Sequence, residues 1–148
     1  MALHDDIAIL NRLNFLKGVD QDALRLIAFG ADHITITNGR VIVEKGGYIN
    51  YALVLISGEV AIYNEQLDQY DYYDEQGTIF AEQAMLSDRF QSPRHIEASK
   101  RSEFIRLRKE LLYRVMEEYP MVAQKLRDYY AQKIKDYTAD LKGQNWVR

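Results

Sequence analysis

The chain has 148 residues, of which 47% are hydrophobic and 28% charged, the proportions of one ordinary globular domain. Its formal net charge of −3 argues against nonspecific nucleic-acid binding, because such binding needs an excess of basic side chains. The absence of cysteine excludes disulfides, thiolate metal sites and a cysteine nucleophile. We see no signal-peptide pattern, and the longest apolar run, residues 52–56, is too short to cross a bilayer, so we expect a cytoplasmic protein that does not contact membranes.

Two short helices are predicted at the start of the chain. The first follows from apolar residues at helical spacing ahead of Gly18, namely Ile7, Leu10, Leu13 and Leu16. The second begins after Asp20, a favourable N-cap, and ends at Gly30.

Between residues 34 and 107 the pattern changes to alternation and short apolar runs. Turn signals such as Asn38-Gly39 and Ser57-Gly58 divide this part of the chain. Eight strands are predicted, at residues 34–36, 41–43, 52–56, 60–64, 70–73, 78–80, 95–99 and 104–107. Short strands at this spacing indicate a small sandwich or a jelly roll.

Helical periodicity returns at Lys109, where one helix is predicted to end at Tyr119. Pro120 then suits the first turn of a last helix that runs to about Lys142, with Gly143 as its stop. Along this helix lies a narrow apolar seam, formed by Tyr130, Ile134, Tyr137 and Leu141. We expect the seam to join two copies of the chain as a homodimer; the alternative is that it packs on the chain's own sheets.

The most informative stretch is residues 77–86, which reads as a strand end followed by a one-turn helix that carries Glu82. The start of a helix offers unpaired backbone N–H groups, which suit an anion and above all a phosphate. Glu82 there would accept hydrogen bonds from sugar hydroxyls. The alternative is that Glu82 stabilises the first helical turn only locally.

Five motifs occur in a fixed order along the chain. They are Gly39 ahead of residues 41–43, Gly46-Gly47, the run from Leu53 to Val60, the segment Gly77-Thr78-Ile79-Phe80-Ala81-Glu82, and Tyr119-Pro120. In this order, over residues 7–141, they resemble the cyclic-nucleotide-binding domain of catabolite-activator (Crp/Fnr-type) regulators and kinase regulatory subunits.

The resemblance implies an α+β fold, an eight-stranded antiparallel β jelly roll (double-stranded β-helix) flanked by short N-terminal helices and a long C-terminal helix. Residues 1–143 would form this domain and residues 144–148 a tail. We expect a stand-alone domain without the winged-helix half of transcription regulators, and therefore no direct contact with nucleic acid.

The resemblance also implies a ligand site. The family's cassette is F-G-E, followed about ten residues on by an arginine and a small hydroxyl residue; the acid holds the ribose and the arginine pairs with the cyclic phosphate. Phe80, Ala81 and Glu82 match F-G-E, with Gln83 beside them. Ser92 falls on the arginine and Pro93 on the hydroxyl residue, while Tyr137 and Thr138 fall where the long helix meets the base.

These departures have a physical cost. Loss of a charged hydrogen-bond partner costs about 1.5–3 kcal/mol, which is roughly tenfold to a hundredfold in affinity. Pro93 removes a backbone N–H, and Ala81 adds a methyl group where the family has glycine. Arg94 would replace the missing cation if residues 92–94 run as an extended strand, since side chains two apart then face the same way. Arg89 is a second candidate, and the alternative for Arg94 is a surface ion pair with Glu97 or Glu82.

Other side chains are expected to be structural. Tyr70 and Tyr72 are predicted to pack on one side of a sheet and Tyr73 on the other; a stacking surface for a purine or a partner is the alternative. His4, His33 and His95 show no metal-ligand spacing. The sequence carries none of the common catalytic motifs, which predicts a binding protein and not an enzyme.

Two functions follow as hypotheses. In the first, the chain is a regulatory sensor domain with a degenerate phosphate-binding cassette, which binds a cyclic nucleotide weakly or of altered type. It then signals through its C-terminal helix to an unidentified protein partner. In the second, the site is vestigial and the chain is a ligand-independent homodimeric interaction module. Neither hypothesis requires a cofactor or a metal.

Overall fold

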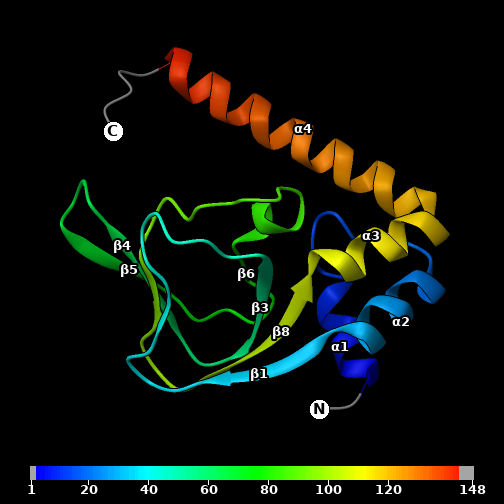
Figure 1. Ribbon diagram of the computed structural model, residues 1–148, viewed down its shortest axis with the longest axis horizontal. Coiled ribbons are helices and arrows are strands. Elements are labelled where there is room, and N and C mark those ends of the chain that lie inside the picture. Colours follow the sequence, from blue (N-terminus) through cyan, green and yellow to red (C-terminus); the bar gives the residue numbers. More distant parts are fainter. Residues whose placement is uncertain (1–2, 144–148) are drawn as a thin grey trace.

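A computed structural model of the protein describes the backbone of residues 3–143 and the side chains of residues 5–132 (Figure 1). Over this part of the chain, eight antiparallel strands form two four-stranded sheets, with two helices before them and two after. The arrangement confirms the predicted jelly-roll fold. Every predicted strand is present, and the strand ends lie within two residues of the predicted ones.

The eight strands divide equally between two sheets. The first sheet has the order β1-β8-β3-β6, and it consists of β1 (Asp32–Ile36), β3 (Tyr51–Ser57), β6 (Ile79–Phe80) and β8 (Ser102–Arg108). The second has the order β2-β7-β4-β5, and it consists of β2 (Val41–Val43), β4 (Val60–Asn64), β5 (Gln69–Tyr73) and β7 (Ile96–Ala98).

Strand β3 separates the two halves of the hydrophobic core. Ala52, Val54 and Ile56 face the helices, while Leu53 and Leu55 face the interior of the roll. Because both faces of β3 are buried, the strand reads in the sequence as one continuous apolar run.

The turn from β3 to β4 is closed by a tight contact with the start of β8. Gly58 adopts φ +107°, and a Cβ atom placed there would lie 2.3 Å from the Ser102 hydroxyl oxygen. That hydroxyl accepts a hydrogen bond from the Glu59 N–H at 3.0 Å, and Ser102 is fully buried. Only glycine fits this turn without a shift of the backbone.

The helices cover one end of the roll. Helices α1 (Leu3–Leu10), α2 (Gln21–Gly30) and α3 (Lys109–Glu118) gather beside β1 and β8, and α4 (Pro120–Gly143) runs across the side where the chain leaves β6 (Figure 1). As predicted, Asp20 caps α2, because its carboxylate accepts a hydrogen bond from the Asp22 N–H at 2.9 Å. No helix of the described residues is both long and apolar enough to cross a membrane.

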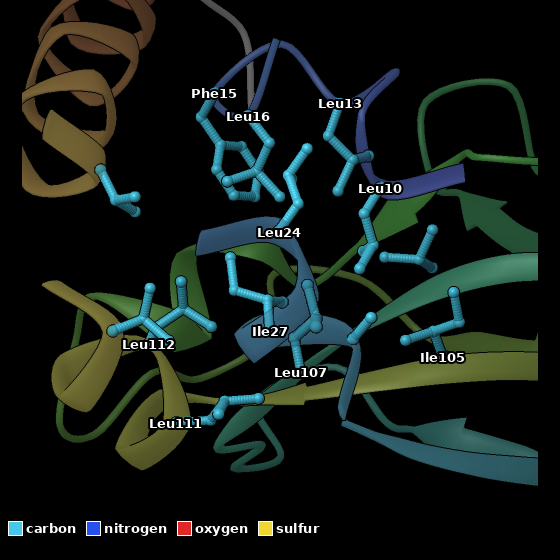
Figure 2. Close-up of a cluster of buried hydrophobic side chains, with 14 of the residues drawn as sticks. Leu10, Leu13, Phe15, Leu16, Leu24, Ile27, Ile105, Leu107, Leu111 and Leu112 are labelled. Atoms are coloured by element: carbon cyan, nitrogen blue, oxygen red, sulfur yellow. The ribbon is translucent and has the colours of Figure 1, made fainter. Parts of the chain in front are cut away.

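The core under these helices combines residues from α1, α2, α3, β8 and the turns at residues 11–18 (Figure 2). Its labelled side chains are Leu10, Leu13, Phe15, Leu16, Leu24, Ile27, Ile105, Leu107, Leu111 and Leu112. Burial of each such side chain stabilises the fold by about 1.5–3 kcal/mol, so this cluster fixes the helices on the first sheet.

The first helix is shorter than the apolar spacing predicts. It ends at Leu10, and residues 11–18 form tight turns, with hydrogen bonds from the Leu13 N–H to the Leu10 carbonyl and from the Leu16 N–H to the Leu13 carbonyl. Leu13, Phe15 and Leu16 are all buried. Phe15 and Leu16 are neighbours in the sequence and point to different faces of any helix, so turns bury both where a helix would not.

The tyrosines of β5 lie on the two predicted sides of their sheet. Tyr70 contacts Tyr63 and Tyr72, whereas the Tyr73 ring, which is 38% exposed, meets the buried Phe80 ring from the other side. Tyr72 is 60% exposed, so the prediction that it serves as packing is wrong for this residue. Strand β5 is an edge strand, and its outer face has no further layer of the described chain to bury the ring.

Candidate functional site

The cassette begins where β6 ends. Ala81 adopts a left-handed backbone with φ 60°, and the short helix η1 (Glu82–Met85) follows directly. An L-residue in this conformation costs about 1–2 kcal/mol relative to a right-handed one. This backbone, and not only the added methyl group, is a reason why glycine suits the position better than alanine.

Six of the predicted ligand residues come together around one hollow of about 160 Å³, which we call the cassette hollow. Residues 81–83 line it from the η1 side, and residues 92–94 line it from the segment ahead of β7. The other lining residues, which sequence reasoning missed, are Ile62, Phe90 and Ile96. Ile62 and Ile96 pair across β4 and β7, a contact between distant strands that the sequence pattern does not show.

Two predicted ligand residues are not placed at the hollow. Phe80 is 5% exposed and packs inside the roll against the Tyr73 ring, so it is a core residue and does not line the hollow. Thr138 lies on α4 beyond the described side chains, as do Ile134, Tyr137 and Leu141 of the predicted seam.

Glu82 contacts the C-terminal helix. The Tyr129 hydroxyl of α4 donates a short hydrogen bond to Glu82 Oε2, across 47 positions of sequence. The Tyr129 ring also packs against the Phe15 ring, with centroids 5.6 Å apart. Burial, and then the hydrogen bond to Glu82, raise the pKa of Tyr129 well above its ordinary value. The phenol therefore stays neutral and remains a donor.

Tyr129 is a site residue that the sequence alone did not reveal. It lies two helical turns ahead of Tyr137, the position that the family resemblance indicated. The resemblance indicated Tyr137 and Thr138 on α4, whereas the described contact is at Tyr129, because the contact depends on how far along α4 the roll meets it.

Ser92, at the position of the family's arginine, forms hydrogen bonds within the chain. Its side chain is buried, and its hydroxyl donates to the Arg94 carbonyl at 2.7 Å. Its backbone N–H and carbonyl bond to Gly47 and Gly46 respectively. Ser92 therefore anchors the segment ahead of β7 and has no hydroxyl proton left for a ligand.

Arg94 is the cation at the cassette hollow. It is exposed, and no described acidic side chain pairs with it, so the surface ion pair with Glu97 or Glu82 does not form. Glu97 accepts a hydrogen bond from Tyr70 at 3.2 Å and contacts His95 at 2.8 Å instead.

The extended geometry predicted for residues 92–94 is wrong. The chain bends at Pro93 and Arg94, with Ser92 buried and Arg94 exposed, because the Ser92 hydroxyl closes a local turn. The bend nevertheless leaves both residues at the rim of the hollow.

Arg89, the second candidate for the missing cation, lies outside the cassette hollow. Its guanidinium carbon lies 5.3 Å from the centre of the Tyr48 ring, and it does not line the cassette hollow. Among the described side chains, no cluster of His, Asp and Glu could hold a metal ion.

Comparison with solved structures identifies proteins that share this fold. A cyclic nucleotide-binding-like protein from Brucella abortus is 24% identical with a TM-score of 0.68, covering 76% of this chain and 98% of its own. The sensor domain of the transcriptional regulator DNR from Pseudomonas aeruginosa is 17% identical with a TM-score of 0.72, covering 93% and 94%. The catabolite activator protein of Thermus thermophilus is 19% identical with a TM-score of 0.72, covering 88% and 62%.

A comparison with curated proteins finds no match. The sequence model of the cyclic nucleotide-binding domain, however, matches residues 33–119, which is more than half of the chain and includes the whole cassette. The chain therefore belongs to the cyclic nucleotide-binding domain family.

Proposed function

We propose that this chain is a regulatory domain that binds a cyclic nucleotide at the cassette hollow and transmits binding through α4. Glu82 would accept hydrogen bonds from the ribose hydroxyls, and Arg94 would pair with the cyclic phosphate in place of the family's arginine. Family membership and the position of both charges at one hollow support this assignment. The signal would pass from α4 to a protein partner.

We expect affinity to be weaker than a complete cassette would give. An exposed arginine meets the phosphate in solvent, where a charge pair is worth only about 0–1 kcal/mol, against about 1.5–3 kcal/mol for a sheltered charged hydrogen bond. The hollow of about 160 Å³ is also smaller than the roughly 300–1,000 Å³ of typical small-molecule sites. The ligand must therefore widen the hollow as it binds.

The observation that carries the signalling proposal is the hydrogen bond between Tyr129 and Glu82. A ribose hydroxyl and the Tyr129 hydroxyl would compete for the same carboxylate. A ligand that takes Glu82 therefore removes a polar contact that holds α4 against η1. Binding would shift the population toward a state with α4 displaced, by at most the ligand's differential affinity for the two states.

Calorimetric titration with cyclic AMP, cyclic GMP and cyclic di-GMP tests the proposal. We expect submillimolar binding of one of them, weakened at least tenfold by Glu82→Ala, weakened by up to about fivefold by Arg94→Ala, and unchanged by Arg114→Ala, which removes an exposed charge on α3. Tyr129→Phe should tighten binding because it removes the competing donor, whereas Tyr113→Phe, an exposed tyrosine of α3, should not. Binding that Tyr129→Phe leaves unchanged contradicts the signalling step.

The second candidate is a ligand-independent homodimeric interaction module with a vestigial site. The buried, internally bonded Ser92 hydroxyl and the small volume of the hollow favour it. No heat with any of the three nucleotides, together with a dimer in solution, would select this function over the first.

A further inference from the structure

We propose that a second hollow, formed by the segment ahead of β3 and the loop ahead of β7, binds a small aromatic carboxylate. This second hollow is lined by Ile42, Tyr48, Ile49, Asn50, Tyr51, Asp88, Arg89 and Phe90. Phe90 lines the cassette hollow as well, so the two lie next to each other. The inference does not depend on the proposed function.

The second hollow has the size and walls of a small-molecule site. Its volume of about 400 Å³ lies in the usual range of roughly 300–1,000 Å³, whereas the cassette hollow falls below it. Rings of Tyr48, Tyr51 and Phe90 line it together with the buried side chain of Ile49. Aromatic walls favour a flat ligand, which they can meet face to face or edge to face.

Arg89 provides the positive charge. Its guanidinium lies over the Tyr48 ring and contacts the Tyr48 hydroxyl at 3.5 Å, and among the described residues no acid pairs with it. A guanidinium held over an aromatic face still presents its edge N–H groups, which match the two oxygens of a carboxylate.

The neighbouring acid does not cancel this charge. Asp88 Oδ1 lies 2.9 Å from Lys109 Nζ, and this contact lowers the pKa of Asp88 and raises that of Lys109. Asp88 and Lys109 therefore form a neutral pair of opposite charges. Arg89 remains as the net charge of the lining, which selects an anionic ligand.

The charge of the lining favours a carboxylate over a phosphate. Among the described residues, Arg89 is its unpaired cation, and its other side-chain donors, the Asn50 amide and the Tyr48 and Tyr51 hydroxyls, are neutral; no helix begins there to add backbone N–H groups. One guanidinium matches the single charge of a carboxylate in the bidentate geometry, whereas a doubly charged phosphate favours a second cation. The volume suits a ligand of one or two fused rings.

Calorimetric titration with 2-naphthoate, and with neutral 2-naphthamide of the same shape, tests the assignment. We expect 2-naphthoate to bind in the submillimolar range and 2-naphthamide about threefold to fivefold more weakly, because Arg89 is exposed and its charge pair is worth at most about 1 kcal/mol. Arg89→Gln should weaken 2-naphthoate binding by the same factor. Arg114→Gln, which removes the same charge from α3, should leave it unchanged.

Two further measurements fix the location. Asn50→Phe fills the second hollow without altering its charge and should abolish 2-naphthoate binding, with circular dichroism to confirm the fold. Glu82→Ala and Arg94→Ala should leave 2-naphthoate binding intact, since a loss in either variant would place the probe in the cassette hollow and overturn the assignment. Equal affinity for 2-naphthoate and 2-naphthamide, or full binding by the Arg89→Gln variant, would also overturn it. Glu82→Ala tests the cassette separately, so either site can fail without the other.

Discussion

The surroundings of Tyr129 keep its phenol neutral. The free energy of unfolding therefore depends on pH in the alkaline range. Burial and the Glu82 hydrogen bond raise the pKa of Tyr129 above its ordinary value of 10.0. A raised pKa in the folded state stabilises the fold fully below the unfolded pKa, and this stabilisation is lost as the pH rises through the folded pKa. The loss begins near pH 10.

We therefore expect the free energy of unfolding of the wild-type protein to fall faster between pH 9 and pH 11 than that of Tyr129→Phe. The difference should stay below about 1.4 kcal/mol per pH unit, because the side chain is partly exposed to solvent. Urea unfolding of both proteins at each pH measures it. Parallel pH dependence of the two proteins would show that Tyr129 does not carry this linkage.

Single residues of the site were predictable only where a motif or a charge marked them. Glu82 and Arg94 were found because an acid at the start of a short helix and a nearby arginine have few roles other than ligand binding or ion pairing. The bend at Pro93 was not predicted, because it depends on the Ser92 hydroxyl bonding back to the Arg94 carbonyl. Tyr129 was missed because its contact depends on tertiary placement.

At the scale of elements, the β3–β4 turn and the turn before β6 make a matched pair. Gly58 and Gly77 both have positive φ, at +107° and +93°, yet a Cβ on Gly58 would collide with Ser102 whereas one on Gly77 meets nothing within 4 Å. Gly58→Ala therefore adds a steric clash to backbone strain, and Gly77→Ala adds strain alone.

We expect Gly58→Ala to lower the free energy of unfolding by about 2–5 kcal/mol and Gly77→Ala by about 1–2 kcal/mol. Urea denaturation at neutral pH gives both values. Equal losses in the two variants would mean that the β8 end yields to the added methyl group without cost.

Helices and strands with a clear hydrophobic period were predictable. The turns at residues 11–18 were not, because adjacent apolar side chains there must both be buried. The alternation in β4 and the apolar run in β3 identified their strands, because burial on one face or on both leaves a direct trace in the sequence. Residues 11–18 kept helical spacing yet form turns, since Phe15 and Leu16 must both reach the core.

At the scale of the whole molecule, the long helix α4 is expected to join two copies. The seam of Tyr130, Ile134, Tyr137 and Leu141 follows the heptad spacing of a coiled coil, and the described part of α4 extends for 24 residues. Two heptads make a short interface, so we expect association in the micromolar range.

Sedimentation should show a dimer at high micromolar concentration. Ile134→Glu places a charge in the seam and should give a monomer, whereas Ala139→Glu places the same charge on the opposite face by helical spacing and should not. A wild-type monomer at that concentration would contradict the dimer.

The proposed competition between Tyr129 of α4 and a ligand for Glu82 has a reciprocal consequence. If occupancy of the hollow weakens the hold on α4, thermodynamic linkage requires that anything which draws α4 away strengthens occupancy by the same factor. A protein that captures the free helix would thereby act as a co-receptor for the nucleotide. The sensitivity of this domain would then be set in the cell by the abundance of its partner as much as by its own residues.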